Sequence, residues 1–150
     1  PPHGAPALGD GIGSVLAGAG DVDGDGLEDV LLGANGADDL APDGGAAGLF
    51  LDPLTNGEHL FREADRLWLG ATDALYVGDS VTGAGDVDRD GYDDVLIGGD
   101  SQGPGTVWIL HGPGEAGTFD ITTATTSLVG EDAGDFAGAP LAGTAPAAAT

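Results

Sequence analysis

The chain has 150 residues, enough for one domain with a buried core, and it carries 26 acidic residues against three arginines and no lysine, a formal net charge of −23. Nucleic acid is not an expected partner, because phosphate binding depends on lysine and arginine, and no apolar run approaches the roughly 18 residues of a membrane helix, so no membrane insertion is expected. Cysteine is absent, which excludes disulfides and thiolate chemistry.

Short apolar runs bounded by glycine, proline, aspartate and asparagine predict an all-β fold. The expected strands of a first repeat are residues 15–17, 30–32, 48–51 and 67–69. Those of a second repeat are residues 76–82, 95–97, 106–110 and 127–129, and residues 136–142 begin a third. Residues 58–67 are the one candidate helix. Four short strands per repeat favour blades of the β-propeller type over a helical repeat.

An acidic segment occurs twice in register. DVDGDGLEDVLLGA at residues 21–34 returns 65 positions later as DVDRDGYDDVLIGG at residues 86–99, and the flanking segments 13–23 and 78–88 also match. Residues 128–143 match residues 68–83, without a third acidic loop. We therefore expect one repeat region with repeats at about 8–70 and 71–130 and a partial repeat at about 131–150.

The acidic segments have the spacing of an oxygen-lined Ca²⁺ loop. Aspartates at positions 1, 3 and 5 can turn inward, glycine at position 6 permits the bend, and position 7 offers its carbonyl. The predicted ligands of two Ca²⁺ sites are Asp21, Asp23, Asp25, the carbonyl of Leu27 and Asp29, and Asp86, Asp88, Asp90, the carbonyl of Tyr92 and Asp94. Glu28 and Asp93, at position 8, are expected to point away.

Each loop is expected to close at position 9. An EF-hand would require an acid at position 12 and a following helix, but Leu32 and Ile97 occupy that position within apolar strands. The alternative is an acidic turn exposed to solvent. Only eight of the 26 acids are explained by two such loops, so a high-salt habitat is a compatible second source of acidic charge.

The repeat resembles the FG-GAP repeat of integrin α-subunit β-propellers. The resemblance rests on Tyr76-Val77-Gly78 or Phe136-Ala137-Gly138, a short strand, and then Gly-Asp-Val-Asp-x-Asp-Gly-x-x-Asp-Val-Leu-x-Gly. It implies Ca²⁺ on one rim of a propeller, an extracellular or cell-surface location, and adhesion or ligand binding. The first copy has Gly11-Ile12-Gly13 where Phe-Gly is usual, and the chain has fewer repeats than the seven blades of the family.

Other motifs are weaker. GDSVTG at residues 78–83 looks like an esterase nucleophile block, but it falls inside the repeat and lacks a histidine partner motif, so no enzyme activity is expected. His3, His59 and His111 are isolated and are expected at the surface or at strand ends. Asp38, Asp39 and Asp43 form either an irregular third cation site or a solvated loop.

These features predict a calcium-binding repeat module for adhesion, ligand binding or assembly. Two alternatives stay open: a subunit of a ring or filament built by head-to-tail stacking of blades, and an accessory domain of a secreted hydrolase. Calcium is one expected partner, and further blades, from the same longer chain or from identical copies, are the other, because unpaired strand edges and blade faces favour association.

Overall fold

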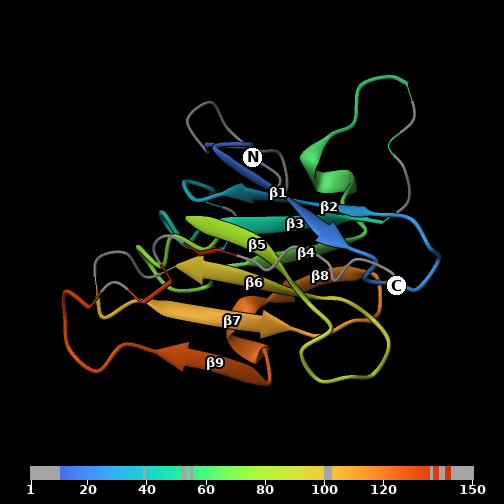
Figure 1. The fold of residues 1–150 in the computed structure, drawn as a ribbon. Helices are drawn as coiled ribbons and strands as arrows, with labels where there is room; N and C mark the ends of the chain where they lie inside the picture. The colour runs from blue at the N-terminus through green and yellow to red at the C-terminus, as the bar shows by residue number, and fades with distance from the viewer. Residues whose placement is uncertain are drawn as a thin grey trace.

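The computed structural model describes residues 11–38, 40–51, 54, 56–99, 103–135, 137–138 and 141–142. Within these residues nine strands form two sheets, and the helices are two single-turn 3₁₀ segments, η1 (Phe61–Glu63) and η2 (Ile121–Thr123) (Figure 1). The sheets do not close into a barrel. The all-β prediction is therefore confirmed.

The first sheet is an antiparallel meander of four strands with one added edge strand. Its order is β1-β2-β3-β4-β8, and β8 runs parallel to β4. The bounds are β1 (Val15–Gly20), β2 (Asp29–Ala34), β3 (Ala46–Phe50), β4 (Arg66–Leu69) and β8 (Gly117–Asp120). The sequence reasoning missed β8, which belongs to the second repeat but pairs with the first.

The second sheet repeats the four-strand meander in the order β5-β6-β7-β9. Its strands are β5 (Ser80–Gly85), β6 (Asp94–Gly99), β7 (Thr106–Leu110) and β9 (Thr126–Val129). A register shift between Gly18 and Gly20 in the first sheet recurs between Gly83 and Gly85 in the second. Both sheets thus have the predicted blade form of four short antiparallel strands.

Two of the predicted strands need comment. The strand predicted at residues 76–82 begins only at Ser80. Of the strand predicted at residues 136–142, positions 136, 139 and 140 lie outside the described residues. Ala137 forms a parallel bridge with Gly105, as Val77 does with Gly45 sixty positions earlier, so the repeat continues to this point.

The candidate helix at residues 58–67 is wrong. Only Phe61–Glu63 is helical, and Ala64 follows with an extended backbone at φ −52° and ψ 137°. Phe61 is buried in a small cluster that also contains Ala46 and Leu69 of the first sheet. Pairing of Arg66–Leu69 with β3 therefore overrides the local helical propensity.

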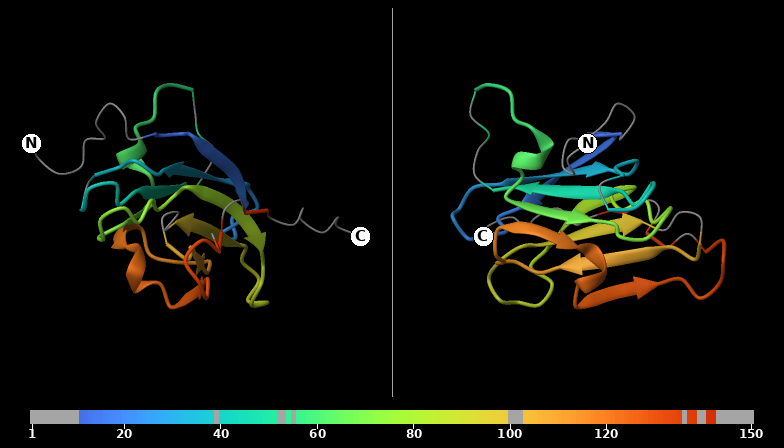
Figure 2. Two further views of the ribbon diagram at one scale, coloured as in Figure 1. Left: turned by 90° about the vertical axis from the view of Figure 1, so that its left-hand side faces the viewer. Right: turned by 180° about the vertical axis from the view of Figure 1, so that it is seen from behind.

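The main core lies between the two sheets, which stack as an upper and a lower layer in Figure 2. Both sheets contribute apolar side chains to one cluster, and Ile121 of η2 completes it. The largest of these side chains are Leu31, Leu49, Trp68, Ile97, Trp108, Leu110 and Ile121. The two repeats are thus packed against each other as one unit.

A glycine pair lets the repeats approach closely. Gly78 has φ +84°, and a Cβ added to Gly33 would lie 2.2 Å from the Gly78 carbonyl oxygen. The equivalent pair recurs with Gly98 and Gly138, at φ +85° and 2.5 Å. The contact explains Gly33, whereas Gly78 is explained by its positive φ and because a Cβ added to it would lie 2.2 Å from the Ala46 carbonyl oxygen.

Replacing Leu31 tests the core between the sheets. Leu31 is 0% exposed, so Leu31→Ala should lower the free energy of unfolding by about 2–5 kcal/mol through lost burial and a cavity. Leu16 on the adjacent strand is 67% exposed, and Leu16→Ala should change it by no more than about 0.5 kcal/mol. Urea unfolding in Ca²⁺ buffer measures both, and equal effects would contradict the described packing.

Candidate metal centre

The first acidic loop connects β1 to β2 and is folded by its own aspartates. The two carboxylate oxygens of Asp21 accept hydrogen bonds from the N–H groups of Gly24 at 2.7 Å and Gly26 at 3.0 Å. Asp23 and Asp25 each accept one from the residue two positions later, at 3.1 and 2.8 Å. Such side-chain to backbone bonds turn a chain tightly, as aspartate does in Asx turns.

Asp29 closes the first loop from inside the sheet. It is the first residue of β2, is fully buried, and accepts a hydrogen bond from the Val22 N–H at 2.7 Å. Carboxylate oxygens of Asp21, Asp23 and Asp29 lie within 4.8 Å of one another. Asp25 is not part of this group.

The second acidic loop, between β5 and β6, repeats this hydrogen-bond pattern. Asp86 accepts N–H bonds from Asp90 at 3.0 Å and Gly91 at 2.9 Å, and buried Asp94 accepts one from Val87 at 2.8 Å. Asp88 accepts a hydrogen bond from the Asp90 N–H, and the Asp90 carboxylate accepts one from the Tyr92 N–H. Oxygens of Asp86, Asp88 and Asp90 lie within 4.8 Å of one another. Equivalent sequences therefore fold into equivalent loops.

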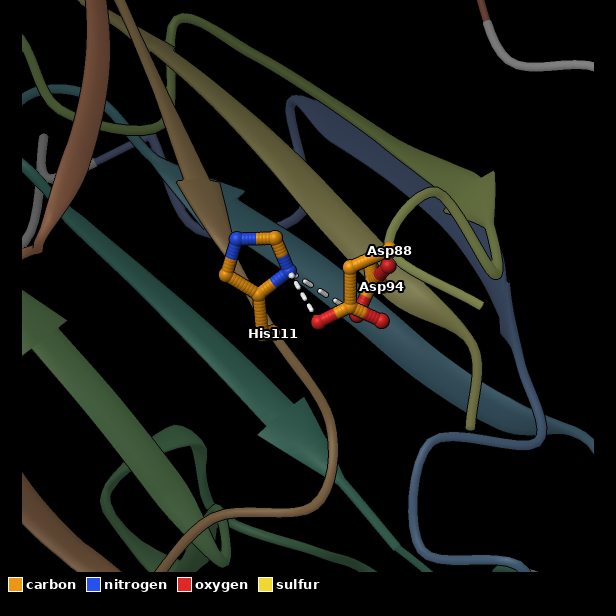
Figure 3. Close-up of side chains that lie close together, drawn as sticks. All are labelled: Asp88, Asp94 and His111. Carbon is orange, nitrogen blue, oxygen red and sulfur yellow. Dashed lines mark ion pairs between the residues drawn. The ribbon is translucent and has the colours of Figure 1, made fainter. Parts of the chain in front are cut away.

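His111 joins the second loop, which the sequence reasoning did not foresee. Its Nδ1 atom lies 3.4 Å from an oxygen of Asp88 and 3.4 Å from an oxygen of Asp94 (Figure 3). The same oxygen of Asp94 also accepts a hydrogen bond from the N–H of Gly112 at 3.0 Å. His111 follows β7, so only the order of strands in the sheet brings it beside the loop. In the first repeat Leu51 holds the equivalent position, sixty residues earlier.

Desolvation, hydrogen bonds and neighbouring charges shift the pKa values of two carboxyl groups of the second loop in opposite directions. Partial desolvation raises the pKa of Asp88, and the charges of Asp90 and Asp94 raise it further. Desolvation also raises the pKa of Asp86, but backbone hydrogen bonds from Gly91 and Asp90 outweigh it, and this pKa lies below its ordinary value. The loop thus favours the charged form of Asp86, whereas repulsion from neighbouring carboxylates opposes the charged form of Asp88. A bound cation would relieve that repulsion.

The two loops touch each other on the right-hand side of Figure 1. The N–H of Asp21 donates to a carboxylate oxygen of Asp93 at 2.8 Å, and the N–H of Asp93 donates to the carbonyl oxygen of Asp21 at 3.0 Å. Asp93 is not part of the carboxylate group of its own loop, and its side chain faces the first loop instead. Glu28, at the equivalent position of the first loop, is exposed.

The remaining predicted residues have simpler surroundings. Leu27 and Tyr92 donate their N–H groups to Asp25 and Asp90, and ligation by their carbonyl oxygens stays a prediction. Asp38 accepts a hydrogen bond from the Asp43 N–H at 2.6 Å, while Asp39 lies outside the described residues. Among the residues that the structure describes, no group of potential metal ligands includes Asp38 or Asp43.

The arrangement can hold a hard divalent cation. Each loop presents clustered carboxylate oxygens in a fixed backbone frame, and Ca²⁺ takes six to eight oxygen ligands in flexible geometry. Sulfur donors are absent from both loops, and one imidazole borders the second. This donor set fits Ca²⁺ better than zinc or copper.

The sequence matches no protein-family model and no curated protein. The resemblance to FG-GAP repeats therefore stays a prediction from the repeated motif. Over the described part of the chain, neither helix is long and apolar enough to cross a membrane.

Removing the Asp93 side chain tests the contact between the loops. Asp93→Ala leaves the Asp21 N–H without its acceptor and should lower the free energy of unfolding by about 1–2 kcal/mol. Glu28→Ala is the matched control, because it removes the same charge from the equivalent position without a loop contact. Chemical unfolding in Ca²⁺ buffer measures the difference, and equal stabilities of the two variants would contradict the contact.

Proposed function

We propose that the chain is a calcium-binding module of β-propeller type, with one structural Ca²⁺ in each acidic loop. The observation that carries the proposal is the duplication of one hydrogen-bond frame around clustered carboxylates. In an acidic turn without a ligand, the repulsion between these like charges opposes the backbone hydrogen bonds that hold the carboxylates in place. A divalent ion converts that repulsion into attraction.

The proposed role of the ions is to fix the rim of the two sheets, meaning the edge where the two acidic loops connect β1 to β2 and β5 to β6. Asp29 and Asp94 are buried at the starts of β2 and β6, so an ion bound to them connects each loop to its sheet. The contact between Asp21 and Asp93 would then link the two ion sites mechanically. A rigid rim suits adhesion or ligand binding by loops on a stable scaffold.

The exposure of the loops fits an extracellular or cell-surface setting. Asp86, Asp88 and Asp90 are all exposed, so solvent and protons compete with an ion there. Extracellular calcium modules work with dissociation constants on the order of 10⁻⁴ to 10⁻³ M. We propose no catalysed reaction for the chain, because the acidic side chains of both loops serve as metal ligands in this proposal.

Calcium titration tests the proposal. We expect calorimetry to detect two bound Ca²⁺ per chain. EDTA should lower the melting temperature by several degrees, and adding Ca²⁺ should restore it. The reason is that binding to the folded state alone adds about 2.7 kcal/mol of stability per site at a hundredfold excess of Ca²⁺ over Kd. Melting in low salt without any response to EDTA or Ca²⁺ would contradict the metal assignment.

Matched variants locate the ions. Asp23→Asn and Asp88→Asn, each at position 3 of a loop, should each weaken one of the two sites at least about tenfold, as loss of a charged ligand does. Asp73→Asn removes the same charge from an exposed residue outside the loops and should leave both sites unchanged. Equal loss in all three variants would point to nonspecific binding of Ca²⁺ to the acidic surface.

A second candidate function is assembly through stacked blades, and one observation favours it. Trp68 and Leu69 of β4 are 2% and 7% exposed, because Trp68 packs in the core between the sheets and Leu69 packs in the small cluster with Phe61. Their equivalents on β9, Leu128 and Val129, are 60% and 59% exposed. The outer strand of the second blade thus presents an apolar surface that a neighbouring blade would cover.

The same comparison identifies the segment of a neighbour that fits. Strand β8 begins at Gly117 with φ +144°, and the equivalent Gly57 of the first repeat has φ +134°. Residues 58–60, which follow it, are exposed. Residues 58–60 of a second copy can therefore pair with β9 in the way that β8 pairs with β4.

Light scattering tests self-association. We expect the mass in Ca²⁺ buffer to rise with protein concentration, and Leu128→Asp to reduce this rise because it places a charge in the contact. Leu40→Asp is the control, since Leu40 is 53% exposed and lies in the connection between β2 and β3, not on β9. A monomer at every concentration would contradict self-assembly and leave β9 to blades of a longer chain.

A further inference from the structure

A cavity of about 230 Å³ lies between the two repeats, and His111, which contacts Asp88 of the second acidic loop, forms part of its margin. Its lining residues come from β4 of the first sheet, from the end of β7, and from β8 and the segment that begins with η2. Its main lining side chains are Arg66, Trp68, Ile109, Phe119, Thr123 and Thr125. The lining is therefore mixed: an apolar side formed by the rings of Trp68 and Phe119 and by Ile109 lies beside polar groups that include Arg66 and His111.

Arg66 is the unusual group in this cavity. It is only 8% exposed, and among the described residues its buried Nε and Nη1 atoms have no hydrogen-bond partner. The neighbouring Asp65 uses one oxygen to accept the Leu51 N–H at 2.8 Å, and no ion pair of the described residues involves Arg66. A buried guanidinium with open donors is costly unless an anion or polar ligand completes it.

The surroundings hold this guanidinium in place. Its Cζ atom lies 4.8 Å from the ring centre of Trp68, within cation–π distance. A Cβ added to Gly114 would lie 2.5 Å from the same Cζ, so the glycine makes room for the planar head group. Burial also lowers the pKa of Arg66, although an arginine stays charged at neutral pH.

The size, walls and charge of the cavity define the chemistry of its ligand. A planar guanidinium matches the two oxygens of a carboxylate, and the apolar side of the cavity at Trp68 and Phe119 favours a small hydrocarbon body. Multiply charged anions are disfavoured by the net charge of −23 and by Asp88 and Asp94, which contact His111 at the margin of the cavity. At roughly 30 Å³ per water, the volume equals about eight waters, which suits a small acid.

We propose that this cavity is a binding site for a monocarboxylate with a small apolar body, held by Arg66 and packed on Trp68 and Phe119. The proposal goes beyond calcium binding and does not depend on it. A free organic acid and the C-terminal carboxylate of a peptide share this chemistry, and the experiment distinguishes them.

Titration of the full chain with benzoate, followed by ¹H–¹⁵N NMR in Ca²⁺ buffer, tests the site. We expect saturable one-to-one binding that shifts the Trp68 indole N–H and the backbone signals of residues 121–125. Benzamide, which has the same shape but no charge, should bind at least about tenfold more weakly, as loss of charge-assisted hydrogen bonds predicts. A second arm uses acetyl-Gly-Phe with a free or an amidated C-terminus. Preference for benzoate or for the free peptide C-terminus supports the site and shows which kind of carboxylate it takes. The proposal is overturned if neither carboxylate binds saturably.

Variants tie the binding to the guanidinium. Arg66→Gln should weaken carboxylate binding at least about tenfold, and Gly114→Ala should weaken it without changing charge by displacing the head group. Arg62→Gln, on an exposed arginine of η1, is the matched control and should bind like the unmodified chain. Unchanged binding by folded Arg66→Gln would overturn the proposal. If Arg66→Gln does not fold, unchanged binding by Gly114→Ala, or shifts in the unmodified chain far from Trp68, would overturn it.

Discussion

The rest of the structure depends on aspartate carboxylates that accept hydrogen bonds from the backbone of their own loops. In both loops the first aspartate bonds two N–H groups and the ninth, buried at the start of a strand, bonds a third. These bonds hold like charges near one another, which costs free energy in the absence of a cation. They also decide where β2 and β6 begin, so the loop geometry and the sheet register are set together.

This constraint couples the repeats as well as the strands. Asp93 links the two loops at one end, the shared core lies between the sheets, and β8 crosses from the second repeat to pair with β4. The crossing strand also creates the cavity around Arg66, because it covers β4 with a segment that does not fill the space beside β7. Rim, core and cavity are therefore consequences of how one repeat packs on the next.

The sequence was a good guide where the information is local. Alternating aspartates, glycine at position 6 and the apolar run after position 9 predicted both loops and the strands that follow. Longer-range partners were not predictable: β8 pairs in parallel with a strand about fifty residues earlier, and His111 meets Asp94 only through the order β6-β7. Asp93 differs from Glu28 by its contact, not by its local pattern. The helix expected at residues 58–67 failed because sheet pairing outweighed propensity.

The most direct test of the account is a crystal structure grown in Ca²⁺, with anomalous diffraction used to locate the ions. The account predicts one anomalous peak in each loop, with oxygen ligands at about 2.3–2.6 Å that include Asp21, Asp23 and Asp29 in the first and Asp86, Asp88 and Asp90 in the second. Well-ordered loops that hold only water at saturating Ca²⁺ would contradict it.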